Sequence, residues 1–173
     1  LLLAGCFRFF KSPVLLFAVV EICVGVSAFC FPFLIHPNPN VPDLVYLKFL
    51  FSKLPLGILL PTVFMGIAFP VGARVYQRFK GDIGKSIGLA YAVNTGGCVL
   101  GGLATGFFFI GSLGFRNSIL VLSVLNVAIG ALIGFLSLRS NTRYVFAGVF
   151  IAFTASAVLV MPADYFSRKY EAL

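Results

Sequence analysis

Long apolar stretches, separated by short segments that carry most of the charges, are the feature that most constrains the fold of this chain. A helix of about 20 apolar residues crosses the hydrocarbon core of a bilayer. The composition agrees: 60% of the residues are hydrophobic and only 10% are charged, whereas about a quarter of the residues in soluble proteins are charged. We therefore expect an all-α integral membrane protein, a bundle of about five transmembrane helices that is part of a larger helical membrane domain.

The apolar stretches predict five spans, at about residues 13–35, 54–73, 87–110, 119–138 and 144–161. Ser12 and Pro13 open the first span as a cap followed by proline at the first helical position. The second span contains several prolines and is expected to be kinked, because each interior proline removes a backbone donor. The segment 44–53 mixes aromatic residues with lysines and provides only about 15 Å of helix, so it is predicted to lie at the membrane interface.

The flanks of these spans suggest a larger protein. Residues 1–12 resemble the end of a preceding helix with a basic loop, residues 13–161 form the transmembrane domain, and residues 162–173 form a polar tail that leads to an absent domain. We therefore expect the chain to be a piece of a longer polypeptide.

The formal net charge is +8. Because the basic residues flank apolar stretches, the expected partner is the lipid bilayer and not nucleic acid. The positive-inside rule places one set of basic residues in the cytoplasm, namely Arg8, Lys11, Arg74, Arg78, Lys80, Lys85, Arg139 and Arg143. Five crossings from an inside start then place the tail outside.

Glycines crowd together in the stretch 90–106, "AYAVNTGGCVLGGLATG". It has neither the lysine of a phosphate-binding P-loop nor the spacing of a dinucleotide-binding turn. Glycines four residues apart instead allow close approach of transmembrane helices, although a ligand at the bare backbone is an alternative. We predict that the third span is the most enclosed helix, with packing contacts at Gly97, Gly101, Gly102 and Gly106.

Glu21 lies inside the first predicted span, where an ionisable group costs roughly 2.5–3.5 kcal/mol on insertion scales and needs a partner. At about 1.5 Å per residue, both Glu21 and Asn94 lie ~12 Å from the cytoplasmic ends of their helices. We therefore predict a buried polar cluster of Glu21, Tyr91, Asn94 and Thr95. This cluster is either a hydrogen-bonded clasp between helices or a proton or cation site. Asn126, in the fourth span, is predicted to form a hydrogen bond to a neighbouring helix.

No catalytic, cofactor-binding or metal site is predicted in this chain. Cys6, Cys23, Cys30 and Cys98 lie in or beside apolar stretches without paired spacing, so we interpret them as small core residues. The few acidic residues lack a surrounding strand pattern, so none of them is assigned a catalytic role.

Two motifs resemble the membrane domain of bacterial membrane-bound spermidine synthase-like proteins, which are sometimes described as transporter and spermidine synthase fusions. The first motif includes the predicted kink, at Pro61, Thr62, Met65, Gly66, Phe69 and Pro70. The second comprises Tyr91, Asn94, Thr95, Gly97, Gly101, Gly106, Phe107 and Gly114. Phe109 departs mildly from the family, which often has an aliphatic residue at this position.

The resemblance implies a multi-pass protein of the bacterial inner membrane. In such proteins, aminopropyl transfer occurs in a separate soluble domain. This chain is therefore expected to be the non-catalytic anchor of an aminopropyltransferase-related protein, with a soluble synthase-like domain or other membrane subunits as partners. Two alternatives remain open: a helical domain that transports polyamines or other cations, and a structural accessory subunit of a membrane complex.

Overall fold

The computed structural model describes residues 12–34, 43–80, 82–138 and 143–160; all of these except Ser12, Asp82 and Leu138 are helical, and no strand occurs among them. This confirms the all-α expectation. The elements are α2 (Pro13–Leu34), α3 (Asp43–Lys80), α4 (Ile83–Leu103), the π-helix η1 (Ala104–Phe109), α5 (Ile110–Ser137) and α6 (Arg143–Val160). Four stretches of the described residues are long and apolar enough to cross a membrane: Pro13–Phe33, Gly57–Arg78, Gly84–Ser137 and Arg143–Val160.

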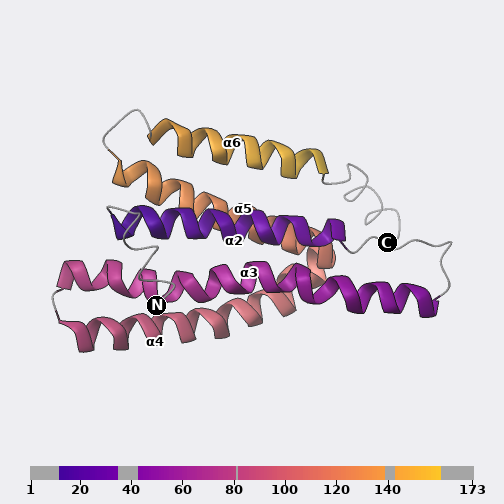
Figure 1. Cartoon of the computed structure of the whole chain (residues 1–173), viewed down its shortest axis with the longest axis horizontal. Coiled ribbons are helices and arrows are strands. Elements are labelled where there is room, and N and C mark those ends of the chain that lie inside the picture. Colours follow the sequence, from indigo (N-terminus) through magenta and orange to yellow (C-terminus); the bar gives the residue numbers. More distant parts are fainter. Residues whose placement is uncertain (1–11, 35–42, 81, 139–142, 161–173) are drawn as a thin grey trace.

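The helices lie side by side in the spatial order α6, α5, α2, α3, α4, and neighbours run antiparallel (Figure 1). The helix in the middle, α2, makes the most extensive contacts, with α5 on one flank and α3 on the other. The two outer helices, α4 and α6, each pack mainly on one neighbour. The first predicted span is therefore the centre of the bundle.

Small residues allow α2 and α5 to approach closely. A Cβ atom added at Gly25 would lie 2.6 Å from the Ser123 carbonyl oxygen and from the Val127 side chain. Gly130 of α5 meets the backbone of α2 in the same way. The glycine of each helix faces backbone and larger side chains of the other, so the two surfaces interlock, as expected for helices without a hydrophobic drive to associate in lipid.

The contact between α2 and α3 is built from larger side chains. Leu16, Val20 and Val71 form a buried cluster against which further apolar residues pack. Phe17 lies over Gly72, where an added Cβ atom would come within 3.2 Å of the ring. The aromatic ring thus packs directly against the glycine.

Helix α3 is longer than the second predicted span. It continues without interruption through Pro55, Pro61 and Pro70, so the predicted interfacial segment 44–53 is not a separate element but the first turns of this helix. At about 1.5 Å per residue, its 38 residues extend about 57 Å, well beyond the ~30 Å hydrocarbon core. The Thr62 hydroxyl lies 2.9 Å from two carbonyls of the preceding turn, where it supports the helix next to Pro61.

The chain reverses at Gly114, within residues 111–118, which separate the third and fourth predicted spans. Gly114 has φ 76° and ψ 168°, a conformation open essentially only to glycine. It separates the α4–η1 segment from the main part of α5, and these two segments run antiparallel to each other (Figure 1). The stretch Gly84–Ser137 therefore consists of two antiparallel legs.

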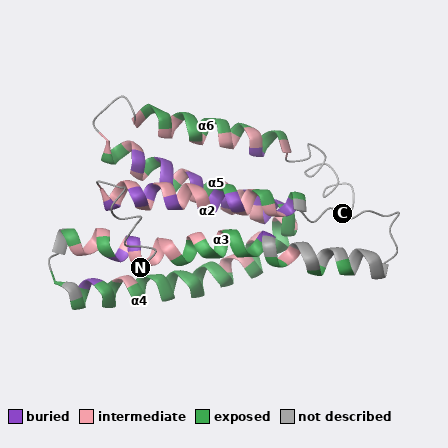
Figure 2. Cartoon of the chain, in the orientation of Figure 1, coloured by how far each residue is buried: buried purple, intermediate pink, exposed green. Residues whose placement is uncertain are grey.

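The prediction that the third span is the most enclosed helix is wrong for the described residues. All residues in the range 91–103 are exposed, as Figure 2 shows along α4. A Cβ atom added at Gly97, Gly101, Gly102 or Gly106 would meet nothing within 4 Å. Glycines permit close approach but do not select a partner, and in this chain the interlocking surface lies on α2 and α5 instead.

Candidate functional site: a cavity between α2, α3 and α4

A cavity of about 350 Å³ lies where α2, α3 and α4 meet. Such a volume falls at the lower end of the usual range for small-molecule sites, about 300–1,000 Å³. The lining is mostly apolar, with one carboxyl group, one amide group and one phenol group. It comprises Phe17, Glu21, Ala68, Phe69, Gly72, Ala73, Tyr76, Leu89, Ala90, Val93 and Asn94.

Helical spacing explains why these residues gather. Side chains four residues apart lie on one helix face, which is the relation between Phe17 and Glu21 on α2 and between Ala90 and Asn94 on α4. On α3, Ala68 and Gly72 have the same spacing, and their small size keeps the helix wall from filling the space between its neighbours. The cavity is therefore a product of small residues on α3 opposite polar residues on the flanking helices.

The structure brings together two of the four residues of the predicted polar cluster. Glu21 and Asn94 line the same cavity from different helices, and Glu21 is half-buried. No described residue makes a direct hydrogen bond to the Glu21 carboxylate or to the Asn94 amide, so a bridge through one water molecule stays a prediction. Glu21 and Asn94, which the helical rise predicts at the same depth, therefore also face the same cavity.

Tyr91 and Thr95 do not join this group. The Tyr91 side chain is 65% exposed and its ring lies edge-on to Phe69, with centroids 6.4 Å apart. The Thr95 hydroxyl donates to the Tyr91 carbonyl at 2.9 Å. At about 100° per residue, both residues lie farther around α4 than the residues that line the cavity, and the Tyr91 ring contacts α3 at Phe69.

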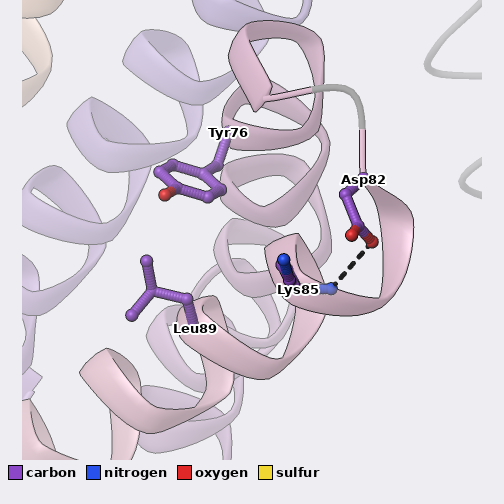
Figure 3. Close-up of a pocket in the computed structure, with 4 residues that line it drawn as sticks. All are labelled: Tyr76, Asp82, Lys85 and Leu89. Carbon is purple, nitrogen blue, oxygen red and sulfur yellow. Dashed lines mark hydrogen bonds between the residues drawn. The ribbon is translucent and has the colours of Figure 1, made fainter.

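A second cavity, of about 560 Å³, adjoins the first near the turn between α3 and α4. Its lining residues are Tyr76, Asp82, Lys85 and Leu89, drawn in Figure 3. Tyr76 and Leu89 also line the first cavity, so these two side chains stand between the membrane interior and the turn. Sequence reasoning missed Tyr76, although its four-residue spacing from Gly72 would have placed it on the same face.

Asp82 fixes the start of α4 at this second cavity. Its backbone is extended, and its carboxylate accepts a hydrogen bond from the Lys85 backbone amide at 3.2 Å (Figure 3). The Ser86 hydroxyl donates to the Asp82 carbonyl at 2.6 Å. This is the arrangement of an N-cap, which satisfies amide groups that have no partner within the helix.

Parts of the two sequence motifs lie on uncovered surface. On α3, Thr62, Met65 and Gly66 are exposed, and a Cβ atom at Gly66 would meet nothing within 4 Å. Asn94 lies at the cavity, but the glycines of the second motif do not. Asn126 differs from its prediction as well, because its amide donates to the Leu122 carbonyl of its own helix at 3.0 Å and not to a neighbouring helix.

The chemistry of the cavity favours a cation with hydrogen-bond donors. A carboxylate and an amide oxygen surrounded by apolar walls attract positive charge, because no other side chain in the lining carries a charge that compensates the carboxylate.

Within the described part of the chain, no three His, Cys, Asp or Glu residues are grouped as metal ligands. Cys23, Cys30 and Cys98 are free thiols, the first half-buried and the others exposed; the exposed pair differs from the prediction of core cysteines, and Cys6 lies outside the described residues.

Comparison with protein families, with curated proteins and with solved structures finds no match for this chain.

Proposed function

We propose that this chain is the membrane domain of a spermidine synthase-like protein and that its α2–α3–α4 cavity binds a polyamine or a related organic cation. The observation that carries the proposal is the meeting of Glu21 and Asn94 in one apolar cavity. The resemblance of the two sequence motifs supports the assignment to spermidine synthase-like proteins. A domain that only anchored a soluble enzyme would not need a carboxyl group beside a cavity at membrane depth, where it is costly.

The two adjoining cavities suggest how a linear amine is held. An ammonium group beside Glu21 pairs with the carboxylate, while the methylene chain lies along Phe17 and the small residues of α3. The amide oxygen of Asn94 accepts a further hydrogen bond from the ammonium group. Tyr76 and Leu89 lead towards Asp82, which offers a second negative group near the turn.

This proposal includes five crossings of the bacterial inner membrane. The stretch Gly84–Ser137 contains 54 residues, which as a single helix would extend about 80 Å, more than twice the hydrocarbon core. The reversal at Gly114 divides it into two crossings, giving five in all. Aminopropyl transfer is then the task of a soluble synthase-like domain, for which this chain provides the anchor.

Equilibrium binding of radiolabelled spermidine to the chain in nanodiscs tests the proposal. Glu21→Gln keeps the shape of the side chain and removes its charge, so we expect affinity to fall by at least about tenfold. Asn126→Ala is the matched control, because Asn126 is also a polar residue within a span but bonds inside its own helix. Binding that is equal in the parent and in Glu21→Gln would refute the cation site. The alternative, a hydrogen-bonded contact between helices, would then remain.

Flux measurements separate binding from transport. If the cavity is part of a transport path, Glu21→Gln abolishes spermidine flux in proteoliposomes while the helical content stays unchanged. Binding without flux in the parent would identify a receptor or a regulatory site instead.

A second candidate, an accessory subunit of a membrane complex, is favoured by the uncovered glycine surface of α4. Gly97, Gly101, Gly102 and Gly106 leave room for another helix. Single cysteines at Gly97 or Gly101, in a background in which the native cysteines are replaced, would form cross-links to a partner helix in membranes of the native host. Cross-linking at Val145, on the outer helix α6, is the control.

A further inference from the structure

A third cavity, of about 430 Å³, lies between α5 and α6, and it is wholly separate from the residues of the cation site. Its lining contains no polar side chain: it is formed by Ala128, Ala131, Leu132, Phe135, Ala147 and Phe150. The alanines create the space, because their side chains are too short to fill the gap between the two helices. The cavity therefore has the dimensions and the chemistry of a site for a hydrocarbon chain.

A fixed cation stands at one end of this cavity. The guanidinium carbon of Arg143 lies 5.7 Å from the centroid of Phe135, which is one of the lining residues. It also lies 4.8 Å from the Tyr144 ring, and a guanidinium nitrogen donates to the Tyr144 hydroxyl at 2.7 Å. Aromatic faces on two sides hold the guanidinium group in place without neutralising its charge.

The position of Arg143 matches the headgroup region. It is the first residue of the candidate span Arg143–Val160, and α5 ends nearby at Ser137. The described acidic residues, Glu21, Asp43 and Asp82, belong to other helices, and no ion pair to Arg143 is present among the described residues. The first amides of α6 add to the positive potential at this end of the helix.

We propose that the groove between α5 and α6 binds an anionic phospholipid, with one acyl chain in the cavity and the phosphate at Arg143. The charge is complementary, and a planar guanidinium group forms paired hydrogen bonds with phosphate oxygens. Apolar contact alone would not distinguish one lipid from another. The arginine supplies the selectivity for a negative headgroup, which is the type of lipid enriched on the cytoplasmic side.

The chain contains no tryptophan, so a single introduced tryptophan reports on the groove. Phe150→Trp places the indole in the lining, and Leu132→Trp is a second reporter in case the first variant does not fold. Each variant is reconstituted in phosphatidylcholine vesicles in which the content of lipid brominated on the acyl chain is increased stepwise from a small fraction. The brominated lipid is either phosphatidylglycerol or phosphatidylcholine, and the quenching of tryptophan fluorescence is measured.

We expect brominated phosphatidylglycerol to quench the groove reporter at several-fold lower content than brominated phosphatidylcholine. Arg143→Gln should reduce this preference about fivefold, the equivalent of one basic residue near a lipid surface. Ala147→Leu fills the cavity and should reduce quenching by both lipids. In the control Leu159→Trp, whose parent side chain is 86% exposed, both lipids should quench equally.

Equal quenching of the groove reporter by the two lipids would overturn the proposal. So would a preference for phosphatidylglycerol that persists in both Arg143→Gln and Ala147→Leu. A groove reporter that neither lipid quenches would show that protein covers this surface, which also contradicts a lipid site.

Discussion

Gly130 of α5 lies so close to Ala18 of α2 that a Cβ atom at the glycine would come within 2.6 Å of the Ala18 carbonyl oxygen. The same atom would lie 2.8 Å from the Ile22 side chain. Because the obstacle is backbone, it cannot rotate away. The separation of the two central helices is therefore set by the absence of a side chain at this position.

Gly130→Ala is expected to force α2 and α5 apart and to lower the free energy of unfolding by about 1–3 kcal/mol, the usual cost of overpacking a core. The measurement is thermal unfolding in detergent. Gly101→Ala is the control, because an added Cβ atom there meets no other atom and alanine favours the helix. A lower melting temperature for Gly101→Ala than for Gly130→Ala would place the principal helix contact on α4 after all.

Gly134 of α5 forms a similar notch, but a side chain of α6 occupies it. The Phe146 ring lies against the position that a Cβ atom would take. Gly134→Ala should destabilise the contact between α5 and α6, and in a Phe146→Ala background the same change should cost much less. A double-mutant cycle of melting measurements should give a coupling of about 0.5–3 kcal/mol; additive effects would contradict the contact.

The sequence indicates the existence of these helices better than it indicates their neighbours. The apolar stretches and the turn near Gly114 follow from bilayer thickness and backbone chemistry, which act locally. The pairing of α2 with α5 depends on how two surfaces interlock. The spacing of Gly130 and Gly134 is itself a four-residue small-residue motif, but the glycines at 96–106 are denser and do not form the contact.

The candidate site was predictable in depth but not in full membership. Helical rise placed Glu21 and Asn94 at one height, and the structure places them at one cavity. The wall supplied by α3, with Gly72 and Tyr76, required knowledge that α3 lies between α2 and α4. Tyr91 is three residues from Asn94, but its ring contacts Phe69 and does not line the cavity.

Gly114→Ala tests the chain reversal between the two legs. With φ at 76° and ψ at 168°, any side chain is strained, and a cost of about 1–3 kcal/mol is expected. The control is Gly111→Ala, since Gly111 lies in the helix and an added Cβ atom meets nothing within 4 Å. Comparable thermal unfolding of the parent and Gly114→Ala would contradict the positive φ angle.

The Asp82 cap predicts a local effect at the start of α4. Asp82→Ala removes the acceptor for the Lys85 amide, so the first turn should lose about 1 kcal/mol. Amide hydrogen exchange at Lys85 and Ser86 should accelerate accordingly. Asp82→Asn keeps a side-chain oxygen acceptor and should preserve most of the protection; equal exchange in all three proteins would show that the cap contributes nothing.

The number of crossings decides where the C-terminal tail lies. Helices α2 to α6 alternate in direction (Figure 1), so five crossings place Arg78 and Ser167 on opposite sides, with Arg78 in the cytoplasm by the positive-inside rule. Ser167 lies outside the described residues, and an external tail conflicts with a synthase that draws its nucleotide-derived cofactor from the cytoplasm. With native cysteines replaced, a membrane-impermeant thiol reagent applied to intact cells should label Ser167→Cys but not Arg78→Cys. Labelling of Arg78→Cys alone would reverse the orientation, and equal labelling of both would disprove the five-crossing topology.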